Sequence, residues 1–333
     1  MLKPIINPAK GKLRVLGYCS GSGNTLWKAY ELQKDMEKTP EGCPFEIVGI
    51  FADKPDSKAV ATAEQYGVPW EAIDIRKYYE DRQKPLKDRA VRAEFDAEAI
   101  TLLEKFDADM ILLAGYVWAT TDIVLDNYLV VNVHPADLAV TDEAGHRLLA
   151  GANGIKSAFD LNMDYLRASA HLATKELDAG PLLVRSPKIP VDYHLHDDYE
   201  SRFRHYLKQV NEQNRQVGAR AVLELALGNF AVDDENHLYY KGEPAPKGLT
   251  VESWEENKPT FQRDRMKLLR PSSVAVIGAS NRPGIGKAIV QNLLDSGFRG
   301  KVYAVNRKGE DVLGFPGFAS ILDIPDPVDL GVI

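Results

Sequence analysis

The 333-residue chain has few of the features that mark disulfide-bonded, metal-binding or membrane proteins. Its two cysteines, Cys19 and Cys43, have no metal-ligand spacing and make no disulfide framework. No apolar run approaches the ~18 residues of a membrane-spanning helix, and no charged-then-apolar leader is visible. The net charge of −7 argues against nucleic acid as the main partner. We therefore expect a cytoplasmic protein whose partner is neither a membrane nor a nucleic acid.

The chain does carry enough apolar residues, 44% of the total, to bury the core of two ordinary domains or one large one. In its first third, short apolar runs alternate with amphipathic segments of helical period. Strands are predicted at 13–17, 45–51, 69–73, 110–114 and 128–131, and helices at 25–38, 58–66 and 92–106. This alternation predicts an α/β fold with a parallel twisted sheet and right-handed crossovers.

The same pattern starts again near residue 269. An apolar strand at 274–277 is followed by a glycine-rich turn at 278–286, a helix at 287–296 and a strand at 301–305. We predict a catalytic domain at 12–250, a helical linker at 251–268 and a truncated, Rossmann-like second domain at 269–333. The last residues, 328–333, are typical of a buried strand, and natural termini rarely lie in a core. We therefore predict that the chain is a fragment of a longer protein.

A glycine turn follows the first predicted strand and opens a helix. It contains Gly21, Ser22, Gly23, Asn24 and Thr25. Backbone N–H groups at a helix N-terminus point toward an anion and lie in the favourable field of the helix dipole. The turn is therefore a candidate phosphate site, although the glycines could equally serve a tight turn without a ligand.

Asn132 and His134 directly follow the predicted strand at 128–131, and Asp178 follows 44 residues after His134. The carboxyl ends of parallel strands form the edge at which open α/β sheets bind ligands. An amide, an imidazole and a carboxylate can together stabilise an oxyanion and move a proton. We therefore predict that these three side chains converge on one cleft.

Six pieces of the chain, in their order and spacing, resemble the folate-dependent formyltransferase family, of the glycinamide ribonucleotide transformylase type. They are residues 20–26, 50–54, 112–116, 132–135, 177–181 and 233–248. The resemblance implies an enzyme with a Rossmann-like sheet that acts on small molecules. Its expected reaction is transfer of a formyl group from 10-formyltetrahydrofolate to an amine, and in its ribonucleotide members the glycine turn holds the substrate phosphate.

The resemblance also implies roles for the three converging residues. Asn132 would donate to the oxyanion that forms when an amine attacks the formyl carbon. His134 would move the proton from the attacking amine to the departing folate nitrogen. Asp178 would favour the imidazolium form of His134 and hold an ordered water. His171, where the family also has a histidine, is interpreted as a hydrogen-bonding structural residue rather than a substrate contact.

Two segments correspond to the family's folate pocket. Trp118 departs from the family pattern there and is expected to reshape the pocket, which the family lines through its backbone. The candidate folate-binding residues are Leu113, Val117, Trp118, Ala119, Thr120, Ala173, Thr174 and Lys175.

The chain departs from the family again after His134, where residues 136–147 replace a short proline- and glycine-containing loop. In the family that loop touches the acceptor, so glycinamide ribonucleotide is in doubt as the acceptor. His194 and His196 lie among aspartates and could be mistaken for metal ligands. We interpret them as part of a charged loop that enters a helix, and we predict no metal site.

The C-terminal piece resembles the CoA-binding domain of NDP-forming acyl-CoA synthetases, through residues 269–280, 297–303, 305–308 and 324–330. An NAD site would place an acidic residue at the end of the second strand, where this chain has Asn306, Arg307 and Lys308. CoA is therefore favoured over NAD, and the full-length protein is expected to continue into an acyl-CoA synthetase module. The candidate CoA-binding residues are Gly278, Ala279, Ser280, Asn306 and Lys308.

Other functions remain open at this point. The formyl acceptor could be CoA or an acyl-CoA-linked amine, since a CoA-binding domain is attached. A hydrolase that releases formate from formyltetrahydrofolate would use the same three residues. A catalytically idle module that senses CoA or folate is the third hypothesis, and the intact set of Asn132, His134 and Asp178 argues against it.

Overall fold

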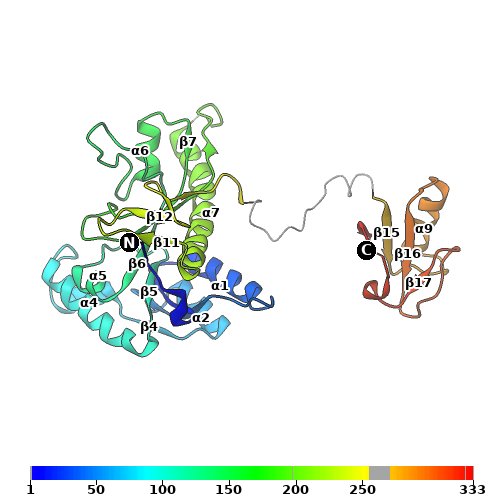
Figure 1. Ribbon diagram of the computed structural model, residues 1–333, viewed down its shortest axis with the longest axis horizontal. Coiled ribbons are helices and arrows are strands. Elements are labelled where there is room, and N and C mark those ends of the chain that lie inside the picture. Colours follow the sequence, from blue (N-terminus) through cyan, green and yellow to red (C-terminus); the bar gives the residue numbers. More distant parts are fainter. Residues whose placement is uncertain (1, 197, 255–270, 327, 333) are drawn as a thin grey trace. The chain divides into compact units, whose positions relative to one another are not determined.

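The computed structural model describes residues 2–196, 198–254, 271–326 and 328–332. The chain forms two compact units, Met1–Trp254 and Glu255–Ile333 (Figure 1). The linker predicted at 251–268, with its helix, falls mostly outside the described residues. The domain boundaries proposed at 12–250 and 269–333 stay a prediction.

The first unit is built on an eight-stranded, mostly parallel sheet. In spatial order its strands are β14 (Leu249–Thr250), β9 (Leu182–Arg185), β8 (Ser169–Leu172), β6 (Leu129–His134), β5 (Met110–Leu113), β2 (Leu13–Cys19), β3 (Phe45–Ala52) and β4 (Trp70–Ala72). The strands from β6 to β4 run parallel to one another. Only β8 is antiparallel to its two neighbours in this sheet of described residues. The predicted α/β fold is confirmed.

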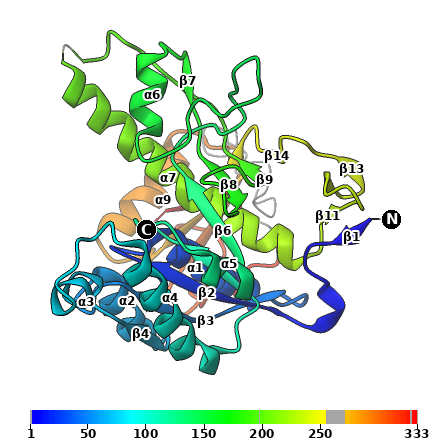
Figure 2. The ribbon, with the colours of Figure 1, turned by 90° about the vertical axis from the view of Figure 1, so that its left-hand side faces the viewer.

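Helices cover both faces of this sheet. They are α1 (Asn24–Met36), α2 (Lys58–Tyr66), α3 (Ile75–Asp81), α4 (Arg89–Leu103), α5 (Asp122–Asn127) and α7 (Tyr199–Ala226), while α6 (Gly154–Asp160) packs on the first half of α7. Along the strands, Val15 and Leu112 face the core shared with α1, α2 and α7. Their neighbours Leu16 and Ile111 face α3, α4 and α5. Because both faces are buried, these strands are continuous apolar runs rather than alternating ones. Figure 2 shows α7 lying against α1.

Local signals fix several helix ends. The Ser57 side chain accepts a hydrogen bond from the Val60 N–H at the start of α2, and Gly67 ends the helix with a left-handed φ of 67°. The segment 76–87, which is dense in charged residues, contains most of α3. Two tyrosines of that helix, Tyr78 and Tyr79, are nevertheless buried, because they face α4.

The strand β6 is longer than predicted and includes both Asn132 and His134. Pairing with β8 on one side extends it, because Asn132 lies opposite His171 and His134 lies opposite Ser169. The two candidate catalytic side chains therefore stand on the last residues of a strand and not on a free loop.

Beyond the sheet, the sequence did not indicate α6 or the short pair β7 (Tyr165–Leu166) and β10 (Ile189–Pro190). These elements share a separate apolar cluster with the first half of α7, through Phe159, Leu166 and Tyr206. Asn153 stands at the N-cap of α6, but its side chain makes no capping hydrogen bond, and the helix has only seven residues. A small antiparallel sheet follows α7 and contains β1 (Lys3–Pro4), β11 (Phe230–Val232), β12 (Leu238–Tyr240) and β13 (Glu243–Pro244).

The second unit has a four-stranded parallel sheet. Its elements are β17 (Gly317–Phe318), β16 (Lys301–Val305), β15 (Ser273–Ile277), β18 (Leu330–Val332) and the helix α9 (Ile285–Asp295). The predicted Rossmann-like beginning is confirmed. None of the described helices, in either unit, is both long enough and apolar enough to cross a membrane.

Candidate active site

Asn132, His134 and Asp178 meet at the carboxyl end of β6. The first two lie two residues apart on the strand, so their side chains point to the same face. Asp178 comes from the loop between β8 and β9. Its Oδ2 lies 3.4 Å from His134 Nδ1, and its Oδ1 accepts a hydrogen bond of 3.3 Å from Asn132 Nδ2. The structure thus brings the three side chains into direct contact.

The loop that carries Asp178 folds back toward β6. Asp178 has a left-handed φ of 53°, which reverses the chain at that point. Gly180 passes so close to the carbonyl oxygen of Leu172 that a Cβ there would overlap it. The Leu172 N–H donates to the Pro181 carbonyl at 3.0 Å and closes the loop. The backbone conformation of this loop therefore places Asp178 next to β6, although the two are far apart in the sequence.

His171 also belongs to this cluster. Its ring is 1% exposed, and its Nδ1 lies 2.9 Å from the Leu172 carbonyl oxygen. Its Nε2 lies 3.2 Å from Asn132 Nδ2 and 3.4 Å from Asp178 Oδ1. Through Nε2, His171 thus contacts two candidate catalytic residues, Asn132 and Asp178. His171 therefore fixes their positions, in agreement with its interpretation as a hydrogen-bonding residue.

The loop that follows β6 turns back onto the same cluster. The carbonyl oxygen of Leu149 lies 2.7 Å from His134 Nε2, and the Gly151 N–H donates to Asp178 Oδ2 at 2.8 Å. Gly151 has a φ of 86°, which favours glycine. The segment 136–151, whose first part (136–147) departs from the formyltransferase pattern, thus contacts both His134 and Asp178.

Arg147 joins this loop to the loop of Asp178. One guanidinium nitrogen, Nη1, donates to the Asp178 carbonyl oxygen, and Nη2 donates to the Gly180 carbonyl oxygen at 2.8 Å. A planar guanidinium suits such paired acceptors better than a lysine ammonium does. The two loops therefore form one hydrogen-bonded structure around the cluster.

Burial and charge act in opposite directions on the two ionisable groups. Burial alone would raise the pKa of Asp178, but the hydrogen bond from His171, the nearby His134 and the Gly151 N–H together lower it to about 2. Burial lowers the pKa of His134, and the Asp178 carboxylate and the Leu149 carbonyl only partly oppose that effect. Asp178 is therefore ionised and His134 is neutral at pH 7.

Burial lowers the pKa of His134 by more than Asp178 raises it, and the effect of Asp178 has the direction expected from the sequence. A neutral ring has one N–H, whereas both ring nitrogens of His134 face oxygen acceptors. The ring can therefore take up one more proton without rearranging its surroundings.

The candidate folate segment 117–120 is held at both ends by a buried ion pair. Arg92 donates to Asp96 Oδ1 at 2.9 Å and to the Tyr116 hydroxyl at 3.0 Å. Thr121 donates to Asp96 Oδ2 through its backbone N–H at 2.9 Å and its hydroxyl at 2.7 Å. Both partners of the ion pair lie on α4, so the helix positions the segment.

The second candidate folate segment lies beside the first. Lys175 Nζ lies 3.2 Å from the carboxylate of Asp122, which follows the 117–120 segment closely in the chain. The Ala173 N–H donates to the Val130 carbonyl, and the Thr174 hydroxyl donates to the Glu176 carbonyl. Leu113, at the end of β5, is buried. Contact of these residues with a folate stays a prediction.

The glycine turn before α1 has mixed exposure. Gly23 caps the helix in a left-handed conformation, with no side-chain hydrogen bond to the first turn. Thr25 is buried against Gly218 of α7, where a Cβ would overlap its methyl group. Gly21 and Asn24 are exposed. The first turn of α1 has free space on the side of these two residues, and phosphate binding there stays a prediction.

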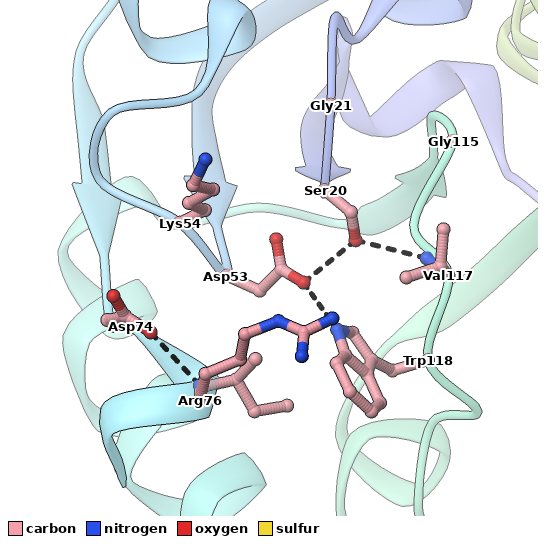
Figure 3. A pocket seen from close by; sticks show the side chains of 10 residues that line it. Ser20, Gly21, Asp53, Lys54, Asp74, Arg76, Gly115, Val117 and Trp118 are labelled. Carbon is pink, nitrogen blue, oxygen red and sulfur yellow. Dashed lines mark hydrogen bonds between the residues drawn. The ribbon is translucent and has the colours of Figure 1, made fainter.

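A cavity of about 390 Å³ opens at the carboxyl ends of β2, β3 and β5 (Figure 3). Gly21, Val117 and Trp118 line it together with Asp53 and Arg76. The Trp118 indole N–H donates to Asp53, so its side chain points into this cavity. None of the described residues that line it belongs to the cluster of Asn132, His134 and Asp178.

A family model described as formyl transferase matches residues 13–215, which is more than half of the chain. The chain belongs to the formyltransferase family. The match covers all three residues of the cluster, as well as the glycine turn and the 117–120 segment.

The fold of the formyltransferase unit is also found in solved structures. Phosphoribosylglycinamide formyltransferase of Coxiella burnetii is 20% identical, covers 72% of this chain and 99% of its own, and has a TM-score of 0.55. A formyltetrahydrofolate deformylase of Pseudomonas syringae has a TM-score of 0.53 at 19% identity, over 69% of this chain and 66% of its own. The trifunctional purine biosynthetic protein adenosine-3 of Gallus gallus is 25% identical over 69% of this chain and 20% of its own.

The second unit has different relatives. A CoA-binding domain model matches residues 272–333. Over 71 residues the chain is 51% identical to the alpha subunit of the ADP-forming acetate–CoA ligase I of Pyrococcus furiosus. That match spans 20% of this chain and 15% of the ligase subunit, so the chain covers only a small part of that relative.

In the CoA-binding unit, the candidate residues lie around two turns. Gly278 has a φ of 79°, and its carbonyl lies so close to Gly286 that a Cβ there would overlap it. The side chain of Asn306 accepts hydrogen bonds from the N–H groups of Lys308 and Glu310, so it shapes its own turn. Ala279 is buried, and Ser280 is half-buried. Their contact with CoA stays a prediction.

Several residues of the site carried no sequence signal. Arg147, Leu149 and Gly151 act through loop conformation, which no local pattern reveals. Asp53 directly follows β3 and lies in the segment 50–54 that resembles the family, but no role of its own was predicted for it from the sequence. No described group of three or more histidine, cysteine and acidic side chains is arranged to hold a metal.

Proposed function

We propose that the formyltransferase unit transfers a formyl group from 10-formyltetrahydrofolate to an amine. The observation that carries this proposal is the contact of Asn132, His134 and Asp178 at the carboxyl end of β6, in a member of the formyltransferase family. An amide, an imidazole and an ionised carboxylate in contact suit a reaction that creates an oxyanion and moves one proton.

Asn132 would stabilise the transition state. When the amine attacks the formyl carbon, negative charge develops on the formyl oxygen. The Asn132 Nδ2 has two hydrogens, which in the structure lie near Asp178 and His171. Turning one of them toward the oxyanion costs one weak contact and gains a charge-assisted hydrogen bond.

His134 would carry the proton. The attacking amine becomes positively charged and must lose a proton, and the folate nitrogen must gain one before it leaves. In the structure the Leu149 carbonyl can only accept, so the single proton of neutral His134 lies on Nε2. Once that carbonyl has moved and the ring proton lies on Nδ1, toward Asp178, Nε2 can accept the proton of the amine and then deliver it to the leaving nitrogen. Asp178, which faces Nδ1, stabilises the transient imidazolium.

The folate would bind along the segments 117–120 and 173–175. Their anchoring by Asp96 and Asp122 supports this placement, because a rigid backbone recognises a flat ring without relying on side-chain identity. The loop 136–151 would contact the acceptor, and the glycine turn would hold an acceptor phosphate if the acceptor has one. The second unit would bind CoA, and formyl transfer to a CoA-linked amine is the variant that this unit favours.

The test is incubation of the full chain with 10-formyltetrahydrofolate and a panel of amines, nucleotides, amino sugars and CoA. The expected result is tetrahydrofolate release that requires one class of acceptor, and its loss in His134→Ala with folate binding retained. Release at the same rate without any acceptor would favour a hydrolase, as in the deformylase relatives. Turnover retained by His134→Ala would refute the proposed role of the histidine.

A further inference from the structure

The loop 136–151 is held at its start by a buried ion pair. Asp137, which follows His134 closely in the chain, is 2% exposed. Arg185, the last residue of β9, donates from Nη1 to both oxygens of the Asp137 carboxylate at 3.2 Å. The Tyr165 hydroxyl donates to Oδ2 of the same carboxylate at 3.3 Å. Two side chains from other elements therefore fix the position of Asp137.

Arg185 is itself held from the side opposite to the loop in the chain order of the sheet. Its Nη2 donates to the Thr250 hydroxyl at 2.7 Å, and its Nε donates to the Lys247 carbonyl at 3.1 Å. The strand β14 lies next to β9 (Figure 2), with Thr250 beside Arg185. A planar guanidinium whose donors reach three separate acceptors has one preferred orientation. The segment 247–250 therefore sets the direction in which Arg185 meets Asp137.

The backbone on both sides of Asp137 is also bonded to the sheet. Ser169 of β8 lies opposite His134 of β6. Its hydroxyl donates to the Ala136 carbonyl at 2.8 Å and accepts from the Leu138 N–H at 3.2 Å. The start of the loop thus has a fixed path.

This order continues through the loop to the candidate catalytic histidine. The Val140 N–H donates to the Asp137 carbonyl at 3.2 Å, and the Leu148 N–H donates to the Val140 carbonyl at 3.0 Å. The next residue, Leu149, has its carbonyl oxygen 2.7 Å from Nε2 of His134. An unbroken series of hydrogen bonds and chain neighbours therefore joins Arg185 to the atom that contacts His134.

Stability alone does not account for this ion pair. Apolar residues of similar volume often replace a buried ion pair without loss of stability, because removing two charges from water is costly. Directed bonds from one guanidinium do fix a position, which apolar contacts do not. Asp137 also lies in the part of the loop, 136–147, that departs from the formyltransferase pattern. The ion pair therefore supplies the placement of this loop.

We propose that Arg185 is a positioning residue that sets the preference of the site for an amine over water. Through Asp137 it holds the loop 136–151 so that the Leu149 carbonyl occupies Nε2 of His134 until an acceptor moves it. The inference rests on the proposed function, in which Nε2 takes the proton of the nucleophile. In a loosened loop Nε2 is uncovered for part of the time, and water can attack the formyl carbon, which yields formate and tetrahydrofolate.

The decisive variant is Arg185→Lys in the full chain. Its ammonium keeps a positive charge beside Asp137, but a single ammonium cannot also reach the Thr250 hydroxyl and the Lys247 carbonyl. Hydrogen–deuterium exchange of the loop 136–151 should become about tenfold faster, the effect of losing a hydrogen bond to a charged group. Tetrahydrofolate release without an acceptor should rise about tenfold relative to release with one, because both quantities report the same opening.

Arg220→Lys is the matched control, because Arg220 forms an ion pair of similar burial with Glu224 on α7. It should change neither the exchange of the loop nor the ratio of the two release rates. The double variant Asp137→Asn/Arg185→Gln removes both charges of the pair, so no charge is left unpaired if Arg185→Lys folds poorly. It should show the same two changes as Arg185→Lys.

Unchanged exchange of the loop in both Arg185 variants would overturn the proposal. So would a parallel fall of the two release rates together with the melting temperature, since that result is typical of a residue that only stabilises the fold. A wild type that releases no tetrahydrofolate under any condition would refute formyl transfer, and this preference with it. Faster loop exchange in Arg185→Lys would even then assign Arg185 to the placement of the loop.

Discussion

At the residue scale, the side chains of the cluster around His134 contact one another. His171 and Asp178 each contact Asn132, and Asp178 also contacts His134. Each of these side chains therefore has its position set by the others. The pKa of about 2 for Asp178 follows from the same contacts, which keep it ionised beside a neutral imidazole.

We expect Asn132→Ala to lower kcat about 100- to 1,000-fold, because removal of one donor to an oxyanion costs this much in comparable sites. Binding of 10-formyltetrahydrofolate should change little, since the amide acts on the transition state. The measurement is steady-state kinetics together with equilibrium binding. Asn127→Ala, on the exposed side of α5, is the matched control and should keep the wild-type rate. A loss of less than about fivefold in Asn132→Ala would contradict the oxyanion role.

The pH dependence of kcat should report His134. Its pKa is lowered, so the neutral form persists below the usual ~6.5. With saturating substrates, kcat should hold below that pH and decline only as the pH falls through the lowered value. The same shift means that folded-state stability begins to decrease as the pH falls below about 6.5. Asp178 adds stability that is present above about pH 3.8 and lost as the pH falls toward its folded pKa of about 2.

Asp178→Asn provides the diagnostic comparison for this profile. The carboxylate raises the pKa of His134, so its removal should move the acidic limb of the residual activity to a still lower pH. If the acidic limb of the pH profile stays at the same pH in Asp178→Asn, or moves to higher pH, His134 is not the titrating group.

At the element scale, the site depends on two loops that contact each other as much as they contact β6. Gly180 and the left-handed Asp178 set the course of one loop. Arg147 and Gly151 attach the other loop to it. The strand β6 supplies Asn132 and His134, and the loops supply Asp178 together with the groups that hold it in place.

Arg147→Gln should lower kcat about 10- to 100-fold while leaving the melting temperature nearly unchanged, since small displacements of a catalytic group have effects of this size. A glutamine cannot bond both the Asp178 and Gly180 carbonyls as the guanidinium does. Kinetics and thermal unfolding would be measured in parallel. His146→Gln, the exposed neighbour in the same loop, should behave as the wild type. If both variants lose activity equally, the effect belongs to the loop in general and not to Arg147.

How much of this could be predicted from the sequence differs between elements. Runs such as 110–114 predicted their strands because both faces of the sheet are buried, and Gly67 predicted the end of α2 because only a left-handed residue fits there. The helix α6 was missed because its seven residues make only two turns, too short for a clear helical period. The meeting of His134 with Asp178 was predicted from the strand end and from the chemistry of the three side chains, but the reversal at Asp178 that makes it possible is set by backbone conformation and left no local pattern. The contact of Leu149 with His134 had no signal at all.

At the scale of the whole molecule, the chain combines a formyltransferase unit with a CoA-binding unit. Each unit has its own sheet and its own apolar clusters. The cluster around His134 and the cavity of Asp53 draw all of their described contacts from the first unit.

A chain that ends at Trp254 should therefore keep its formyl-transfer rate within about twofold, because sites without shared partners act almost independently. If the second unit binds CoA as proposed, CoA should raise the melting temperature of the full chain and leave that of the truncated chain unchanged. Both quantities would be measured on the two proteins side by side. A large drop in rate after truncation would mean that the CoA-binding unit contributes to the reaction itself.

The hydrogen bond between Leu149 and His134 bears on whether the formyl donor is hydrolysed in the absence of an acceptor. While the Leu149 carbonyl is hydrogen-bonded to Nε2 of His134, that nitrogen cannot act as a base. A water molecule near the formyl donor would then not be activated for hydrolysis. Binding of the acceptor amine would have to displace the segment of Leu149, and this displacement would free Nε2 of His134 to act as a base. Under the proposed function, this contact would protect the formyl group of the donor from hydrolysis until the acceptor is bound.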